Sequence, residues 1–564
     1  MRIKTLAGLS ALAMVCVTTA AWGSDFSVGP NGSDSAAGGP TAPWATVQHA
    51  VDVMQPGDTV TVADGSYAGF WMKNRQGDAQ HRFTIRSQNP LGAKITGPSP
   101  TSNDPNDSVQ LVSVSFATID GFDVTGAPRA GISIRTFGDE TGADTTDDIV
   151  QNCRSHDNGA GVTAGRHDGV FTGFAQNVLI QDNEVDGNAE HGIYVSNSAD
   201  NPVVRGNKSH DNKANGLQIN ADGSTGGDGV ISHWLMENNV VYGNGGAAAI
   251  NLDGATFGIL RNNLVYGNAK GGIALFMGDS VEASHDNVVV GNTVYDPSGT
   301  RFAVQIDNGA DNNVVFDNVF WSAASGMEIG TVNNLSHDYN VVSSYSGGTA
   351  SAHESSPPAA QLFVNAASSD YHPGAALIGQ GMATYGGATA PGTDLEGNAR
   401  PQTGACDIGC YEHGGTATTP TAHPPTTPDA GNGAGAMTNG ARDAAVSDAA
   451  AAYPSSTEAG TPPSPGVADA SGNDAAVIPS GEGDGDAQTS APVSPVPGET
   501  DAGVAPAVAD DASVGAAGDP AAPVWGAGNA QSGNGCSASP GPAGAGGTVL
   551  LSLSIALLAI RRRR

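Results

Sequence analysis

A six-residue motif that begins with asparagine recurs through the middle of this chain. Its clearest copies start and end with asparagine, at 183–188, 207–212, 239–244 and 263–268. Shorter copies begin at Asn292, Asn318 and Asn340, and the series extends backwards to Cys153 and Asp123. Successive copies start 22 to 32 residues apart. A period of this length is typical of a solenoid, in which each repeat stacks on its neighbours.

The residues of each repeat favour strands over helices. Many repeats carry a second short segment, such as 192–196, 216–220 or 272–276, in which apolar residues alternate with polar or small ones. That alternation predicts half-buried strands. The fixed leucines of leucine-rich repeats and the periodicity of helical repeats are both missing from the sequence. We therefore predict an all-β solenoid, a parallel β-helix, whose leading asparagines stack at about 4.8 Å per coil. Cys153 and Asp123 depart from that ladder.

Residues 43–54 are the one segment predicted to be helical. Val47, Ala50, Val51 and Met54 recur at helical spacing and form a single apolar stripe. Because a solenoid exposes its core at its ends, we expect this helix to cover the N-terminal opening. The ordered region then divides into the cap and first coils at 24–115, the central repeats at 116–345 and a closing segment at 346–413.

Short segments on both sides of the repeats resemble one superfamily. They are Pro-Gly-Asp-Thr at 56–59, Gly-Ser-Tyr at 65–67, Phe-Thr-Ile-Arg at 83–86, Ala-Lys-Ile-Thr-Gly at 93–97 and the closing segment 407–412. These resemble the pectate-lyase-like superfamily of right-handed parallel β-helices, in particular bacterial polysaccharide lyases. The resemblance covers nearly all of 25–412 and implies a right-handed β-helix with a polysaccharide ligand. It implies no single activity, because this fold carries lyases, hydrolases, epimerases and proteins that only bind.

The N-terminus has the features of a secretory signal. Arg2 and Lys4 precede an apolar run at 6–17, and Ala21 and Gly23 are the small residues that cleavage requires. We predict a signal peptide at 1–23 and export of the protein. The alternative, an N-terminal membrane anchor, would need a longer apolar run.

The C-terminal part is predicted to hold the protein at the bacterial cell surface. Residues 414–540 are mostly Ala, Pro, Gly, Ser, Thr and Asp, which predicts a disordered stalk. Residues 541–564 contain an uncharged span followed by four arginines, which predicts a transmembrane segment. With Cys536 upstream, this order resembles the sorting signals of myxobacterial surface proteins and implies a C-terminal sorting protease. A plain tail anchor is the alternative.

Charge and cysteine content limit the partners. The net charge of −33 and the scarcity of lysine argue against nucleic acid as a partner. Membrane contact is expected through the C-terminal segment only. Cys406 and Cys410 are close enough in sequence to pair in an oxidising compartment, whereas Cys153 is isolated.

Outward-facing residues of the predicted strands form a polar stripe that suits sugar hydroxyls. Arg135, Ser196, Gln305 and Glu328 belong to it. As substrate-binding residues we predict Tyr194, Asn197, Gln218, Asn220, Asn251 and Asp307. The alternative reading of each residue is ordinary solvated strand surface.

The densest polar cluster of the middle repeats is where lyase chemistry would fit. A polysaccharide lyase needs a base for the proton next to a uronate carboxylate, and a group that neutralises that carboxylate. We predict His191, Lys213 and Arg166 as catalytic residues. Calcium is the possible cofactor, held by Asp222, Asp228 and Asp253 if their loops converge. The alternatives are a surface charge for each base and solvated turns for the aspartates.

These features favour a surface enzyme that acts on an acidic polysaccharide by β-elimination. A non-catalytic carbohydrate-binding or adhesive rod is the alternative. A glycoside hydrolase or epimerase on the same fold is a further one, although the Asp-Pro-His-Asp signature of alginate epimerases is missing from the sequence. Convergence of His191, Lys213 and an Asp cluster in one groove would favour the enzyme.

Overall fold

A computed structural model describes residues 23–99, 107–136, 145–160 and 167–414 of this chain. All of them lie in the first of two compact units, Met1–Thr461. The signal peptide predicted at 1–23, apart from its last residue, and the stalk and membrane segment, apart from residue 414, fall outside the described residues. Within the described part, no helix is both long enough and apolar enough to cross a bilayer.

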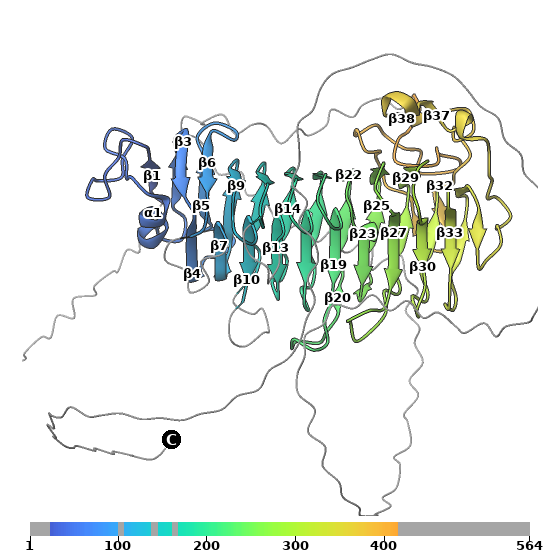
Figure 1. Cartoon of the computed structure of the whole chain (residues 1–564), viewed down its shortest axis with the longest axis horizontal. Coiled ribbons are helices and arrows are strands. Elements are labelled where there is room, and N and C mark those ends of the chain that lie inside the picture. Colours follow the sequence, from blue (N-terminus) through green and yellow to red (C-terminus); the bar gives the residue numbers. More distant parts are fainter. Residues whose placement is uncertain (1–22, 100–106, 137–144, 161–166, 415–564) are drawn as a thin grey trace, which may run out of the picture. The chain divides into compact units, whose positions relative to one another are not determined.

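The described chain forms three parallel sheets, and successive strands along the sequence belong to each sheet in turn (Figure 1). Sheet 1 contains β1 (Asp25–Val28), β2 (Thr59–Val62), β5 (Phe83–Ser87), β8 (Ala117–Asp120), β11 (Ile149–Gln151), β14 (Leu179–Gln181), β17 (Val203–Arg205), β21 (Leu235–Glu237), β25 (Ile259–Arg261), β28 (Val288–Val290), β31 (Val314–Phe316) and β34 (Ser336–Asp338). Sheet 2 contains β4 (Phe70–Gln76), β7 (Val109–Ser115), β10 (Ile132–Arg135), β13 (Val170–Gly173), β16 (Ile193–Ser196), β19 (Leu217–Asn220), β23 (Ala248–Asp253), β27 (Gly271–Phe276), β30 (Phe302–Ile306), β33 (Ser325–Ile329) and β36 (Tyr345–Ser346). Sheet 3 contains β3 (Gly65–Ala68), β6 (Ala93–Thr96), β9 (Asp123–Thr125), β12 (Arg154–His156), β15 (Glu184–Asp186), β18 (Lys208–His210), β22 (Val240–Tyr242), β26 (Leu264–Tyr266), β29 (Thr293–Asp296), β32 (Val319–Ser322) and β35 (Val341–Val342).

Each coil contributes one strand to each sheet. The apolar side chains of these strands point into the interior of the β-helix. Ile193 pairs with Leu217, and Leu217 pairs with Ile250, so that equal positions of successive coils stack on one another. These side chains belong to a single buried apolar cluster that runs from Val28 to Val342. The alternation of apolar and polar residues in each strand therefore fixes which side chains face outward.

The predicted asparagine ladder is confirmed. In each step the side-chain Nδ2 of one asparagine donates to the Oδ1 of the next, at 2.9 to 3.1 Å. The ladder runs through Asn183, Asn207, Asn239, Asn263, Asn292, Asn318 and Asn340. All of these side chains are buried, so each amide satisfies backbone groups that water cannot reach.

The ladder position of the earliest coils differs from the sequence alignment. The backbone N–H of Cys153 donates to Asn183 Oδ1, so that Cys153 occupies the ladder position as aligned. In the coil before it, however, the equivalent residue is Phe122, whose backbone N–H points to the Cys153 sulfur. Asp123 was therefore misaligned by one residue. Its carboxylate forms an ion pair with Lys94 on the outer face of sheet 3.

The capping helix is confirmed in a shorter form, as α1 (Val47–Val53). Thr46 begins it by accepting a hydrogen bond from the backbone N–H of His49. Val47, Ala50, Val51 and Met54 are buried in the same core as the coils. The helix packs against β1, β2 and β4, at the first coils of the β-helix.

The closing segment first pairs with the last coil, where Ser355 bridges Val341 and Glu354 accepts from Asn340, and then packs along the sides of the last coils. It contains two 3₁₀ turns, η1 (Ala359–Gln361) and η2 (Ala366–Ser368), and the strands β37 (Phe363–Asn365), β38 (Asp370–Pro373), β39 (Thr384–Tyr385) and β40 (Ala388–Thr389). Figure 1 shows it in yellow and orange beside β29 and β32. Leu362, Phe363 and Tyr371 cover apolar and aromatic residues on the outside of sheet 3. A further pair of short strands, β20 (Ile231–Ser232) and β24 (Ala255–Thr256), joins two turns.

The cysteine pairing that the spacing left open is not formed. Cys406, Cys410 and Cys153 are each a buried free thiol. Cys406 instead donates to a carboxylate oxygen of Asp317, at 3.3 Å.

Candidate functional site

The outer face of sheet 2 carries one continuous row of side chains, one from each coil. The strand register places Tyr194 beside Gln218, and Gln218 beside Asn251. We call this the outer row; its members are Gln110, Ser133, Phe171, Tyr194, Gln218, Asn251, Ala274, Gln305 and Glu328. Neighbours in the row are separated by about 4.8 Å, the spacing of paired strands.

Three of the predicted substrate-binding residues, Tyr194, Gln218 and Asn251, therefore lie together in the outer row. Asn220 belongs to a parallel row that ends the same strands, paired with Ser196 on one side and Asp253 on the other. These four side chains share one face because they stand at equal or alternate positions of adjacent strands.

The side chains of the other two predicted substrate-binding residues form hydrogen bonds within turns. Asn197 has a positive φ of 54°, is buried, and accepts a hydrogen bond from the Ser196 hydroxyl. Asp307 accepts hydrogen bonds from the backbone N–H groups of Asn308 and Thr331. Both therefore have local partners that hold the backbone after the strands of sheet 2.

His191 lies next to the outer row, at the start of β16. Its ring is 5.2 Å from the Tyr194 ring, edge to face. Its Nδ1 accepts a hydrogen bond from the backbone N–H of Asn215 at 3.1 Å, and Nε2 is 3.9 Å from Glu190. Since Nδ1 is the acceptor, the neutral ring carries its proton on Nε2. In this state His191 can donate a proton or a hydrogen bond to a ligand but has no free lone pair to act as a base.

The other two predicted catalytic residues do not join His191 in a described cluster. Lys213 is exposed on the turn before β19, two residues ahead of Asn215, and its ammonium has no ion-pair partner among the described residues. Arg166 lies outside the described residues. The predicted convergence of base and aspartates in one groove is thus not seen in the part of the chain that is described.

A buried charged group that sequence reasoning missed lies at the beginning of the outer row. Asp107 is fully buried and forms a two-pronged ion pair with Arg129, at 2.7 and 2.6 Å. Arg135 reaches the same carboxylate at 3.6 Å and donates to Gln110 in the outer row at 3.2 Å. Asp107 follows a polar, Pro-containing stretch that is typical of solvated loops, so the sequence holds no signal for its burial.

The three aspartates predicted to bind calcium do not meet. Asp253 is buried, and its carboxylate accepts from the backbone of Gly278 and Asp279 and from the Ser280 hydroxyl, at 2.7 to 2.8 Å. Burial raises the pKa of this carboxyl, against the effect of those hydrogen bonds. Asp222 and Asp228 instead accept from residues within their own loop. Among the described residues, Asp222, Asp228 and Asp253 do not form a group whose ligand atoms lie within 4.8 Å of one another, so this arrangement does not fit one calcium ion.

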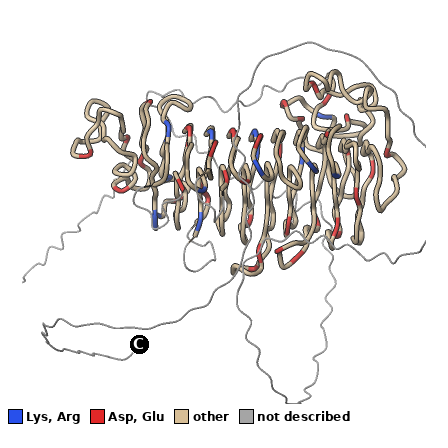
Figure 2. Tube along the Cα trace, viewed as in Figure 1, with Lys and Arg blue, Asp and Glu red and all other residues tan. Residues whose placement is uncertain are grey.

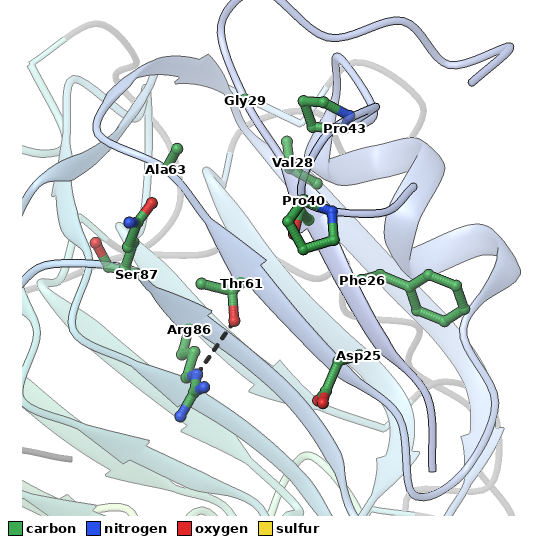
Figure 3. Close-up of a pocket in the computed structure, with 12 residues that line it drawn as sticks. Asp25, Phe26, Val28, Gly29, Pro40, Pro43, Thr61, Ala63, Arg86 and Ser87 are labelled. Atoms are coloured by element: carbon green, nitrogen blue, oxygen red, sulfur yellow. Dashed lines mark hydrogen bonds between the residues drawn. The ribbon is translucent and has the colours of Figure 1, made fainter. Parts of the chain in front are cut away.

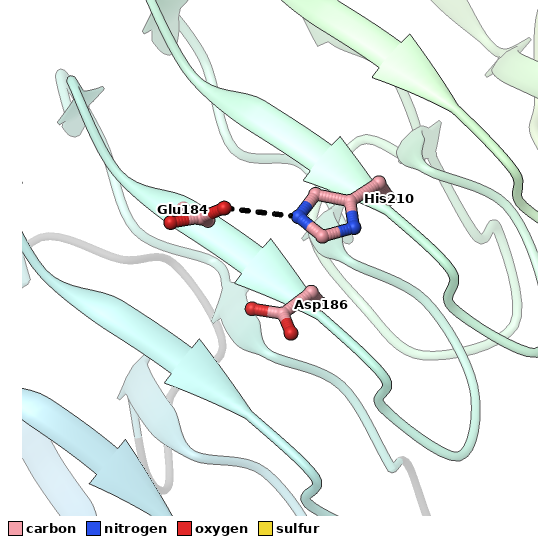
Figure 4. A group of neighbouring side chains, drawn as sticks. All are labelled: Glu184, Asp186 and His210. Carbon is pink, nitrogen blue, oxygen red and sulfur yellow. Dashed lines mark hydrogen bonds and ion pairs between the residues drawn. The ribbon is translucent and has the colours of Figure 1, made fainter.

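One group within the described residues does bring possible metal ligands within 4.8 Å of one another: Glu184, Asp186 and His210 on sheet 3 (Figure 4). Each carboxylate already has a cationic partner, Glu184 with Lys208 at 2.8 Å and Asp186 with Arg154 at 2.8 Å. The Lys208 ammonium is the main cause of the lowered pKa of Glu184. We interpret the group as part of an alternating charge ladder that joins successive coils.

The described surface includes one pocket near the N-terminus and a smaller one on sheet 2. The larger one, about 440 Å³, is near the N-terminus between sheet 1 and the preceding loop (Figure 3). There the Arg86 Nε donates to the Thr61 hydroxyl at 3.3 Å. The smaller one, about 210 Å³, lies on the outer face of sheet 2 and includes Asn251, Ala274 and Gln305 of the outer row. It thus includes one predicted substrate-binding residue, Asn251, and one further residue of the predicted polar stripe, Gln305.

Charged residues are mixed rather than separated over the described coils. In the view of Figure 2, Lys and Arg occur singly among acidic residues, and the described chain presents no continuous basic face there.

Comparison with known families identifies the repeat architecture. Residues 92–280 match the family model described as a right handed beta helix region. The chain carries a right-handed parallel β-helix. This confirms the predicted fold class for the repeats. Residues 228–343 also match the model described as periplasmic copper-binding protein (NosD). No curated protein matches the chain.

Solved structures similar to this chain are distant in sequence. Pectate lyase Pel9A is 16% identical over 69% of this chain and 96% of its own, with a TM-score of 0.47. The complex of XylC with xylose is 10% identical over 70% and 99%, with a TM-score of 0.44. An alginate lyase from Paenibacillus sp. is 18% identical over 56% and 99%, with a TM-score of 0.36.

Proposed function

We propose that this β-helix binds an acidic polysaccharide along the outer face of sheet 2. The observation that carries the proposal is the outer row, in which Tyr194, Gln218 and Asn251 follow one another at the spacing of adjacent coils. Amide groups both donate to and accept from sugar hydroxyls, and a tyrosine ring packs against the apolar face of a sugar. A chain of sugars laid along this part of the row would meet a tyrosine ring or an amide at Tyr194, Gln218, Asn251 and Gln305.

Cationic side chains at two points of this face suit the carboxylates of an acidic polymer. Arg135 lies beside the early part of the row and donates to Gln110. Arg301 lies at the smaller pocket, beside Asn251 and Gln305. Only 14 of the 56 acidic residues lie in 414–564, so most of the net charge of −33 belongs to residues 1–413, and the case for an anionic ligand rests on the local position of these two arginines.

Elimination chemistry is a second candidate, favoured by the contact between His191 and Tyr194 beside the row. In that reaction a base removes the proton next to a uronate carboxylate, the electron pair forms a carbon–carbon double bond, the bond to the leaving sugar oxygen breaks, and that oxygen takes up a proton from solvent. His191 would donate from Nε2 to the carboxylate. Lys213 or Arg166 is the residue proposed to act as the base.

We further propose that the protein is exported and held at the bacterial cell surface. The support is the sequence of the ends, namely the signal peptide at 1–23, the stalk at 414–540 and the membrane segment at 541–564 with its sorting protease. The description of the NosD family names a periplasmic protein, which agrees with export. At the surface the sheet 2 face would meet extracellular polysaccharide.

Binding and elimination can be tested with one set of polymers. The purified protein is mixed with polygalacturonate, alginate and hyaluronan, with calcium or with EDTA, and examined by gel retardation and by the ultraviolet absorbance of unsaturated uronates. Tyr194→Ala should reduce retardation at least about tenfold, because it removes an aromatic contact and exposes a gap in the row. Arg86→Ala, in the pocket on sheet 1, is the matched control and should bind as the wild type does.

The two candidate functions give different results in that experiment. Retardation without any rise in absorbance supports a binding rod. A rise that is lost in His191→Ala and Lys213→Ala supports the lyase. Absence of both signals with every polymer would contradict the proposed function.

A further inference from the structure

The smaller pocket on sheet 2 has an apolar floor built from two alanines and a phenylalanine. In the outer row, Ala274 stands between Asn251 and Gln305, so one coil contributes only a methyl group. Ala248 and Phe302 pack with Ala274 in a small apolar cluster of their own on the outside of the sheet. The resulting hollow of about 210 Å³ has room for a single sugar ring, whose apolar face can rest on this floor.

Three polar side chains line the pocket. Asn251 and Gln305 are two coils apart, about 9.6 Å from the strand spacing, and flank the hollow along the row. Arg301 also lines the pocket, with its guanidinium 4.7 Å above the Phe302 ring. One guanidinium nitrogen donates to the carbonyl of Ala247 at 3.4 Å, and no carboxylate pairs with Arg301 among the described residues. The Arg301 guanidinium is thus held in place by a backbone carbonyl and has no carboxylate partner among the described residues.

We propose that this pocket is a subsite for one uronate unit of the polysaccharide, an assignment that rests on the proposed function. The sugar ring lies over Ala274, between Asn251 and Gln305, and the uronate carboxylate pairs with Arg301. The amides of Asn251 and Gln305 take the hydroxyls on either side. A guanidinium fits a carboxylate with two parallel hydrogen bonds, which a lysine does not reproduce.

The next residue of the outer row fixes how the polymer is placed. Glu328 pairs with Gln305 in the strand register and brings a carboxylate one coil beyond the pocket. Because every unit of a polyuronate carries a carboxylate, the unit beside the subsite must turn its carboxylate away from Glu328, since like charges at that distance repel. The favoured placement therefore puts a carboxylate at Arg301 and a hydroxyl at Glu328.

The test compares each polyuronate with its carboxyl-reduced form, which has the same linkages but no charge. Binding of polygalacturonate and alginate, native and reduced, is measured by gel retardation and calorimetry with the full chain. The wild type should bind a native polymer about tenfold more tightly than its reduced form. Arg301→Gln should bring that ratio close to one while leaving affinity for the reduced form unchanged. Ala274→Leu, which fills the hollow, should weaken both forms by about tenfold.

Controls separate this subsite from the proposed function. Arg86→Gln removes an arginine from the pocket on sheet 1 and should keep the wild-type ratio. Arg301 is exposed, so its substitution should leave the unfolding midpoint unchanged, and circular dichroism checks this for every variant. A wild-type ratio in Arg301→Gln would overturn the subsite while polysaccharide binding stands. A wild type that binds none of the four polymers would overturn the proposed function and the subsite together.

Discussion

Asp296 ends a second asparagine ladder, and its replacement by asparagine should stabilise the protein. The ladder consists of Asn158, Asn188, Asn212, Asn244 and Asn268, each bonded to the next through side-chain amides, up to Asn268. The last step differs, because Asp296 Oδ1 accepts from the backbone N–H of Asn268 and Oδ2 has no hydrogen-bond partner among the described residues. In the wild type a carboxyl group thus stands in a buried position built for an amide.

The magnitude follows from the pKa of this carboxyl. Burial raises the pKa of Asp296 from 3.8 to about 6, against two backbone hydrogen bonds that lower it. Folding therefore favours the protonated form. The stability that this group contributes is complete below pH 3.8 and is lost as the pH rises through about 6. A difference of about two pKa units corresponds to about 3 kcal/mol. Asp296→Asn should recover up to that amount at pH 8 and much less at pH 4.

Chemical unfolding at several pH values tests this directly. Urea midpoints of the wild type and Asp296→Asn are compared from pH 4 to pH 8, followed by fluorescence and circular dichroism. The difference between the two proteins should grow between pH 4 and pH 7 and then stay constant. A difference that is independent of pH, or a variant less stable than the wild type at pH 8, would refute the reasoning. Because both proteins share every other titrating group, their difference isolates this carboxyl.

Three further substitutions test the same architecture. Asn239→Ala removes a buried amide that donates to Asn263 and accepts from the previous coil. It should lower the free energy of unfolding in urea by about 3–5 kcal/mol, whereas the control Asn365→Ala, at an exposed position, should change it very little. Gly216→Ala should lower the melting temperature by several degrees, because a Cβ there would lie 2.7 Å from the Asn244 amide nitrogen. Asp317→Asn should reduce the loss of stability between pH 4 and pH 8, since burial raises the pKa of this carboxyl from 3.8 to about 7; hydrogen exchange of the closing segment should follow the same trend.

The period of the sequence was sufficient to predict the coils, because every repeat packs against its neighbours through the same contacts. Asn239 and Asn263 stand at equal positions of successive motifs, and equal positions stack in a solenoid. The same logic identified Tyr194, Gln218 and Asn251 as outward neighbours, since residues that alternate with buried ones must face out. The helix α1 was predictable for a similar local reason, its apolar stripe.

The prediction of the catalytic and calcium residues depended on loops, where sequence spacing does not give distance. Asp253 ends β23 next to Asn220, as expected, yet its carboxylate is used to fix residues 278–280 of a later loop. His191 is adjacent to the outer row, but the turn of the following coil supplies the N–H that occupies its Nδ1. Neither partner is predictable from the local sequence, because each comes from the next coil.

The sequence by itself therefore determined the coil, its period, its buried amides and the direction of each strand residue. These properties are set by contacts that repeat identically, so a local pattern is enough. The tertiary structure alone decided that Asp107 is buried with Arg129, that Arg301 faces a hollow beside Asn251, and that the closing segment covers sheet 3. Such contacts join segments that occur once, and their partners are chosen by the packing of the whole chain rather than by any repeat.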